Sequence, residues 1–221
     1  MNTEFKKNPT WKVLGFLFLL LVVPIIWVMI NKTGKHYSKK LPILFDIEIT
    51  PKGDTIFHTI SNFKLVNQNG DSTTLNSIGN HIYLANFFFS TCQTTCPKMN
   101  GFIAQHIYTE FEKDTAIRFL SFTVDPANDS PAVLRQYAKS FNVKFPQWQF
   151  LTGNKKTIYN LAEFSFKIPG ADAGHQGLFH SEQIVLVDRL RRVRGVFETG
   201  GQADKKEIID AVRALKLEYK K

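Results

Sequence analysis

The chain has 221 residues, 43% of them hydrophobic, which is enough for one ordinary domain with a sizeable core and a terminal extension. Its formal net charge of +9 lies mostly at the start, because residues 1–40 contain seven lysines and one glutamate and so hold six of the nine net charges. The remainder is close to neutral, which argues against a nucleic-acid-binding protein, since such proteins need a basic face on the folded domain.

Residues 13–30 form an uncharged, mostly apolar run of 18 residues. As a helix this run would span about 27 Å at about 1.5 Å per residue, close to the hydrocarbon thickness of a bilayer. A cleaved signal peptide is the alternative, but no small-residue cleavage site follows, and the apolar region of a signal peptide is usually only about 7–15 residues long. We therefore expect an N-terminal flank over residues 1–12, a transmembrane anchor over 13–30 and a tether over 31–55.

A single folded domain is predicted over residues 56–221. Hydrophobic periodicity and turn signals predict its elements in order. They are a hairpin around Asn69-Gly70, a strand over 82–89 buried on both faces, a helix over 97–113, a strand over 117–124, a helix from Pro131 with Ser130 as its N-cap, a strand over 148–151, a helix over 157–164, strands over 183–187 and 193–197, and a helix over 203–215. Alternating strands and helices favour parallel pairing, so we expect an α/β fold with a central mixed sheet flanked by helices.

Three of the predicted helices carry apolar stripes that should face the core. The stripes are Met99, Ile103, Ile107 and Phe111 in the first helix, Val133, Leu134, Tyr137 and Phe141 in the second, and Ile208, Ile209, Val212 and Leu215 in the last.

Both cysteines of the chain lie where the strand over 82–89 becomes a helix. Ser90 and Thr91 offer N-cap hydroxyls, and a spacing of four places Cys92 and Cys96 on one side of a helical turn. Near the positive end of a helix dipole, a thiol is expected to have a lowered pKa and to act as a thiolate toward soft metals or disulfides. The plain alternative is a buried pair or structural disulfide, although so short a ring is stabilised little by loop closure.

Two soft thiolates select Cu(I), and a third ligand would tighten such a site. Among the six histidines, His175 and His180 are the candidates, because they lie in or after the glycine-rich stretch 169–177 that leads to the strand over 183–187. Structural zinc would need a second Cys or His pair, which is missing, and haem attachment would need Cys-x-x-Cys-His. Thiol–disulfide exchange stays open as the alternative chemistry.

One basic cluster lies outside the N-terminal region: Arg189, Arg191, Arg192 and Arg194. It is either a solvated turn between two strands or a docking patch for an acidic partner.

The chain resembles the Sco/SenC family of membrane-anchored copper chaperones for cytochrome c oxidase assembly, which have a thioredoxin-like domain. The resemblance covers about residues 60–215, and an N-terminal anchor precedes it. It rests on Cys92-x-x-x-Cys96-Pro97, on Thr123-Val124-Asp125-Pro126 with Asp129-Ser130-Pro131, on Trp148-x-Phe150-Leu151-Thr152-Gly153, and on His180 ahead of Ile184-Val185-Leu186-Val187-Asp188.

The resemblance implies copper, as Cu(I) or Cu(II), bound by Cys92, Cys96 and His180, with Asp125 in a supporting, non-ligating role. It also implies a metallochaperone that takes copper from a periplasmic donor and passes it to the copper-bearing subunit of a cytochrome oxidase. The expected location is the inner membrane in a single pass, with residues 1–12 cytoplasmic and the domain periplasmic; the lysines that flank the anchor do not fix this orientation.

The sequence departs from the family pattern without changing the implied ligands. Gln93 and Thr94 stand where members often have a proline and then an acidic residue, and Phe179 replaces an aspartate. The main alternative function is a thiol-disulfide reductase that keeps the oxidase's copper-ligand cysteines reduced, with Cys92 as the attacking thiol. A peroxidase or sensor role would rest only on the shared fold.

Overall fold

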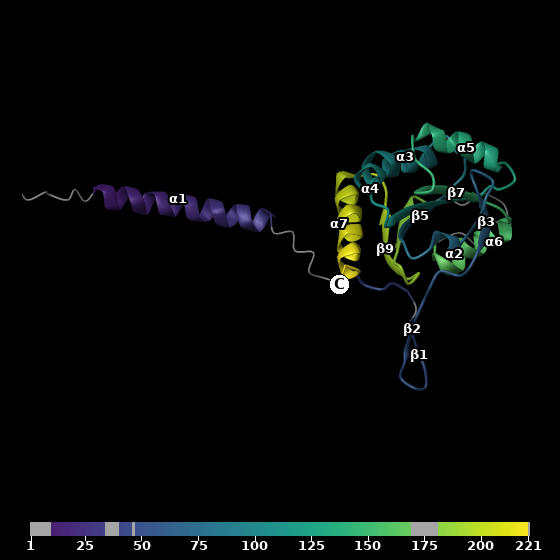
Figure 1. Ribbon diagram of the computed structural model, residues 1–221, viewed down its shortest axis with the longest axis horizontal. Coiled ribbons are helices and arrows are strands. Elements are labelled where there is room, and N and C mark those ends of the chain that lie inside the picture. The colour runs from purple at the N-terminus through teal and green to yellow at the C-terminus, as the bar shows by residue number, and fades with distance from the viewer. Residues whose placement is uncertain (1–9, 34–39, 46, 169–180, 221) are drawn as a thin grey trace, which may run out of the picture. The chain divides into compact units, whose positions relative to one another are not determined.

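The structure is a computed structural model that describes residues 10–33, 40–45, 47–168 and 181–220. The chain divides into two compact units, residues 1–39 and 40–221. The described residues of the first unit form the helix α1 (Thr10–Thr33) (Figure 1). Within the described residues, no helix combines the length and the apolar character needed to cross a membrane.

The second unit is built on a seven-stranded sheet in the order β4-β3-β7-β6-β5-β8-β9 (Figure 1). Its strands are β3 (Lys64–Asn67), β4 (Ser72–Thr74), β5 (Ile82–Phe88), β6 (Ile117–Thr123), β7 (Trp148–Thr152), β8 (Gln183–Val187) and β9 (Val193–Glu198). β5, β6 and β7 pair in parallel, and the other pairs are antiparallel. The predicted mixed sheet is therefore confirmed, with the parallel strands at its centre where helical crossovers connect them.

Helices connect these strands in the predicted order. They are α2 (Leu75–Ile78), α3 (Thr95–Phe102), the π-helical segment η1 (Ile103–Tyr108), α4 (Thr109–Phe111), α5 (Pro131–Ser140), α6 (Lys155–Asn160), the π-helical segment η2 (Leu161–Ser165) and α7 (Gln202–Glu218). The helix predicted over 97–113 is thus one helical stretch with a wider turn in its middle. Ser130 caps α5 and Pro131 is its first residue, as predicted.

The central strand β5 is buried on both faces because helices cover both sides of the sheet. On one face Phe88 stacks on Tyr137 of α5, with ring centroids 5.0 Å apart. On the other face Phe87 meets Phe166, which directly follows η2, edge to face at 5.4 Å. This explains why the strand reads as a continuous apolar run rather than an alternating one.

The predicted core stripes are buried in α3 with η1 and α4, and in α7. In α5 the prediction fails at Val133, which is 39% exposed, whereas its neighbour Leu134 is fully buried. Successive residues of a helix point about 100° apart. Leu134 faces the sheet, where α5 packs on β7 and β3, and Val133 lies at the margin of the buried face.

The arginine cluster divides into two parts: Arg189 and Arg191 lie in a half-exposed turn between β8 and β9, as one of the two alternatives predicted, whereas Arg192 and Arg194 are held by ion pairs within the domain. Arg194 is only 3% exposed and bonds Asp188 and Glu218, and Arg192 bonds Asp188 as well. Arg194 also donates to the backbone carbonyls of Leu41 and Pro42, at 2.6 and 2.9 Å. Part of the segment predicted as a tether is therefore fastened to the edge of the sheet.

A separate two-stranded antiparallel ribbon follows this segment, made of β1 (Ile47–Ile49) and β2 (Thr55–Phe57).

Candidate functional site

The two cysteines follow β5 at the edge of the sheet where β6 and β7 also end, because parallel strands share their carboxyl-terminal edge. β8 runs antiparallel to β5, with Ala85 opposite Val185, so β8 begins at this same edge. The sheet therefore brings the end of β5, the end of β6 at Thr123 and the start of β8 at Gln183 to one edge.

The two thiols are close together, as predicted, but the local geometry differs from the prediction. α3 begins at Thr95, so only Cys96 is helical, and Cys92 lies in the loop before it. The predicted N-cap role of Ser90 and Thr91 is wrong, because Thr94 occupies the cap position and makes no side-chain cap bond. Instead the backbone N–H of Cys96 donates to the sulfur of Cys92 at 3.4 Å. The Cys92 sulfur thus takes a first-turn N–H that a helix itself leaves unpaired.

The environments of the two thiols push their pKa values apart. Burial raises the pKa of Cys92, but hydrogen bonds from the backbone N–H groups of Cys96, Thr94 and Thr95 and from the Cys96 thiol outweigh it and lower this pKa to about 7. Burial raises the pKa of Cys96 to about 12, and the negative charge of a neighbouring Cys92 thiolate adds to the effect. Both thiols are free and buried, 7% and 4% exposed. The site therefore pairs one thiol poised to ionise with one that holds its proton.

A buried carboxylate fixes the loop that carries Cys92. Asp129 is 0% exposed and accepts hydrogen bonds from the backbone N–H of Ser90 at 3.1 Å and from the hydroxyls of Ser90 and Thr123. It thereby ties the loop after β5 to the end of β6 and the start of α5. Sequence reasoning listed Asp129 only as part of a motif; its position just before a Ser-Pro helix start was the one local signal for such a role.

Asp125, predicted to support the site, lies half-buried beside this network. Its backbone N–H donates to the Thr123 hydroxyl at 3.0 Å, and its carboxylate accepts from the side chain of Asn128 at 2.7 Å. The backbone N–H of Asp125 and the carboxylate of Asp129 therefore share the hydroxyl of Thr123, whereas the Asp125 carboxylate itself is bonded to Asn128.

A second buried network holds α3 against the sheet behind the dithiol. Asn86 of β5 donates to Asn100 of α3 at 2.9 Å and accepts from Ser121 of β6 at 2.6 Å. Asn100 in turn donates to the hydroxyl of Tyr137 at 3.1 Å. Every polar group in this hydrogen-bond network is buried or half-buried. The network therefore fixes the position of α3, the helix that carries Cys96, against the sheet.

Two soft sulfur donors at one edge fit Cu(I), which accepts two or three ligands. Within the described residues no group of three or more His, Cys, Asp and Glu side chains gathers that could hold a metal ion. The predicted third ligand, His180, and the other candidate, His175, lie outside the described residues. His58 is engaged away from the dithiol, with its Nε2 2.8 Å from the carbonyl of Ser165.

Comparisons with known proteins identify relatives of this chain by sequence and by fold. A family model described as SCO1/SenC matches residues 52–216. The SCO1 protein homolog of Bacillus subtilis is 32% identical over 136 residues, which cover 61% of this chain and 70% of that protein.

Solved structures of similar fold include BsSco, described with a disulfide switch and as a member of the Sco family of cytochrome c oxidase assembly proteins. It shares 29% identity with a TM-score of 0.61, over 72% of this chain and 95% of that one. ScoI of Bradyrhizobium japonicum with copper bound shares 25% identity with a TM-score of 0.57, over 71% of this chain and 99% of that one. Both likenesses extend over nearly the whole of the matched chains.

Proposed function

Because the chain belongs to the SCO1/SenC family, we propose that it is a membrane-anchored metallochaperone that binds copper and delivers it to the copper centre of a respiratory cytochrome oxidase. The observation that carries this proposal is the dithiol at the sheet edge, with the Cys92 sulfur on the N–H of Cys96 and the two pKa values split to about 7 and about 12. The copper bound to Bradyrhizobium japonicum ScoI and the oxidase-assembly description of BsSco support it.

Copper enters as cargo, and the two thiols would hold it through their sulfurs. Cys92 is half ionised near pH 7 and is ready to bind, whereas Cys96 must give up a proton when it becomes a ligand. The same high pKa favours reprotonation of Cys96 when copper leaves. This difference suits a protein that must release its metal to another set of ligands by exchange, with no bond made or broken in a substrate.

His180 would supply the third ligand, and Asp125 would have the supporting, non-ligating role that the family resemblance implies. The family resemblance is the support for His180, and the position of its neighbours is compatible: β8, which starts three residues later, begins at the edge where β5 ends. The two soft sulfurs favour Cu(I), and an imidazole ligand from His180 would also suit Cu(II), so both oxidation states belong to the proposal.

A thiol-disulfide reductase is the second candidate, and the split pKa values favour it independently. A thiolate attacks a disulfide best when its pKa lies near ambient pH, which is the case for Cys92. Cys96, four residues away and buried beside it, would then displace the partner from the mixed disulfide. Both activities fit one protein, because a dithiol must be reduced before it can bind copper.

The anchor and the location are supported by the sequence alone. The uncharged run over residues 13–30 has the length of a membrane-spanning helix, and the family resemblance puts the domain on the periplasmic side, where it would meet a copper donor and the oxidase subunit. Fractionation of cells that express the full chain tests this point. Recovery of the full chain in the soluble fraction without detergent would contradict the anchor.

The decisive experiment measures copper stoichiometry and affinity of the full, detergent-solubilised and reduced chain. We expect one tightly bound copper that is lost when Cys92 and Cys96 are both replaced by serine. His180→Ala should weaken copper binding strongly while the dithiol still reduces a test disulfide, and His175→Ala serves as the matched control with near-normal affinity. No copper above the double-serine level would refute the metallochaperone and leave the reductase.

A further inference from the structure

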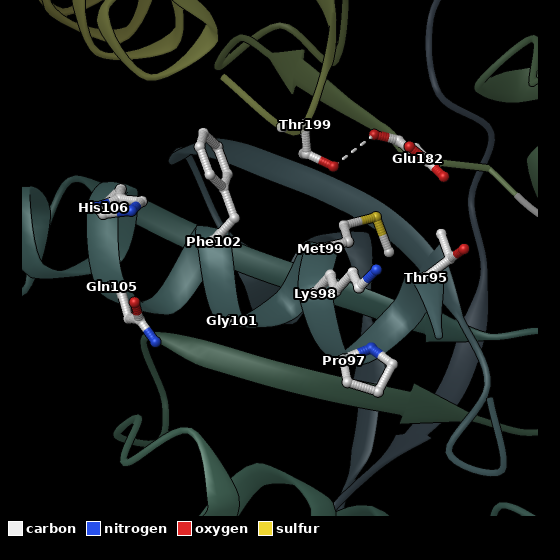
Figure 2. Close-up of a pocket in the computed structure, with 11 residues that line it drawn as sticks. Thr95, Pro97, Lys98, Met99, Gly101, Phe102, Gln105, His106, Glu182 and Thr199 are labelled. Atoms are coloured by element: carbon white, nitrogen blue, oxygen red, sulfur yellow. Dashed lines mark hydrogen bonds between the residues drawn. The ribbon is translucent and has the colours of Figure 1, made fainter. Parts of the chain in front are cut away.

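A groove of ≈ 560 Å³ runs along α3, starting beside the dithiol. Figure 2 shows Met99 and Phe102 pointing from the helix toward Thr199 and Glu182, which lie on the facing wall. The helix wall is formed by Thr95, Pro97, Lys98, Met99, Gly101, Phe102, Gln105 and His106, and the facing wall by Glu182, Thr199 and Gly200. Neither sulfur lines the groove, but Thr95 and Pro97 flank Cys96 in the chain and the backbone N–H of Thr95 bonds the Cys92 sulfur, so one end of the groove is adjacent to the dithiol.

Gly101 lines the groove and has no side chain that could project into it. It lies inside α3, where glycine destabilises a helix relative to alanine, and its helical backbone does not require glycine. A Cβ atom built on Gly101 would meet no atom within 4 Å, so packing inside the protein does not require glycine either. The residue leaves open space on the groove side, which would allow a second polypeptide backbone to approach closely.

The dimensions and charges of the groove fit an extended chain. From Thr95 to His106 the helical wall is about 16 Å long at about 1.5 Å per residue, the length of about five extended residues. Lys98 is exposed on the helix wall two residues beyond Cys96, and Glu182 is exposed on the facing wall. Residues two apart on a helix do not face each other, so Cys96 is buried while Lys98 lies on the groove side, where an acidic side chain of a bound segment would meet its ammonium in the first turns of α3.

We propose that this groove binds an extended segment of the partner polypeptide, with an acidic residue near Lys98, and so presents a cysteine of that segment to Cys92. The inference rests on the proposed function only in assuming that the partner brings cysteines to the dithiol. The proposal adds a docking surface to the metal site. Gly101 would let the backbone of the partner approach and Lys98 would bind its acidic residue, and neither residue would be a copper ligand.

The test uses the full chain with Cys96→Ser, which leaves Cys92 able to form a mixed disulfide that cannot resolve. The probe is a peptide of about six residues, one more than the about five that span the groove, with one cysteine, a glutamate two positions away and glycine and serine elsewhere. A matched peptide has lysine in place of glutamate, and both are made in the two chain directions. In the exchange, the Cys92 thiolate attacks a peptide disulfide, the bond between the two peptide sulfurs breaks, and the released thiol takes up the proton.

We measure how far 2-mercaptoethanol displaces each peptide from Cys92 at equilibrium. The glutamate peptide should resist displacement at least about tenfold better than the lysine peptide. Gly101→Ala should abolish this advantage while raising the melting temperature, which excludes misfolding as the cause. Lys98→Ala should reduce it, and Lys139→Ala, an exposed lysine on α5 away from the groove, should not.

Equal displacement of both peptides, a preference for the lysine peptide, or an unchanged advantage in Gly101→Ala would overturn the docking groove. Copper binding separates this outcome from failure of the proposed function. With both cysteines present, Gly101→Ala should bind copper as the unmodified chain does. A chain that binds no copper but shows the peptide preference would contradict the metallochaperone and leave the groove in place.

Discussion

The unequal acidity of the two thiols predicts that they react at very different rates with an alkylating agent. At pH 7 about half of Cys92 is thiolate, whereas only about one Cys96 in 100,000 is. A more basic thiolate is also a better nucleophile. With the Brønsted coefficient of about 0.4–0.5 that describes thiol–disulfide exchange, the difference between the two pKa values makes the Cys96 thiolate roughly 200-fold more reactive than the Cys92 thiolate. Cys92 should therefore react about 300-fold faster than Cys96.

The assay follows iodoacetamide labelling of the reduced full chain by mass spectrometry of the cysteine-bearing peptides between pH 5 and 9. The rate at Cys92 should rise about tenfold per pH unit below its pKa and level off above about pH 7, because only the thiolate reacts. The single variants Cys96→Ser and Cys92→Ser confirm which labelled peptide belongs to which thiol; the absolute rates are taken from the unmodified chain, because each thiol shifts the pKa of the other.

Two results would refute the reasoning. Equal labelling rates at the two cysteines would mean that burial does not hold the proton on Cys96. A Cys92 profile that levels off only near pH 9, its ordinary range, would mean that the N–H groups of the first helical turn do not stabilise its thiolate. Either result would also remove the observation that carries the proposed function.

Three further predictions concern stability, each measured by urea unfolding of the reduced chain. Asp129→Asn should lower the free energy of unfolding by about 2–4 kcal/mol, because an amide cannot accept all three donors now on the carboxylate; an unchanged midpoint would exclude the loop-fixing role. Arg194→Met should cost about 3–5 kcal/mol, since it leaves the buried Asp188 and two backbone carbonyls without this donor. Leu134→Ala should cost about 2–5 kcal/mol and the adjacent Val133→Ala only about 0.5 kcal/mol, and similar losses would contradict the burial that separates them.

The family resemblance and most of the fold could be predicted from the sequence because their signals are local. β8 has the predicted bounds, and α5 begins at the predicted Ser130-Pro131 pair. A capping hydroxyl, a proline at the first helical position and a period in hydrophobicity each depend on residues within one or two turns of each other. The position of the two cysteines after a buried strand is local in the same sense.

The predictions that are wrong concern residues that are close in sequence and chemically able to take the same position. Ser90 and Thr91 have the chemistry of an N-cap, but Ser90 gives its hydroxyl to Asp129, 39 residues later in the chain, and α3 starts farther on. Val133 and Leu134 are equally apolar, and the packing of α5 against β7 and β3 decides which of them faces the core. Sequence patterns do not rank such alternatives, because the deciding contact comes from another element.

The sequence by itself determined that a dithiol follows a central strand of an α/β sheet, because that placement follows from apolar runs and the cysteine spacing. Tertiary structure alone decided how the dithiol works as a site: Cys92 caps the helix from outside it, Asp129 holds the cysteine loop, and α3 and the end of β9 leave a groove beside it. These features depend on hydrogen bonds and packing between segments far apart in the chain, which exist only once the sheet has brought its strand ends to one edge.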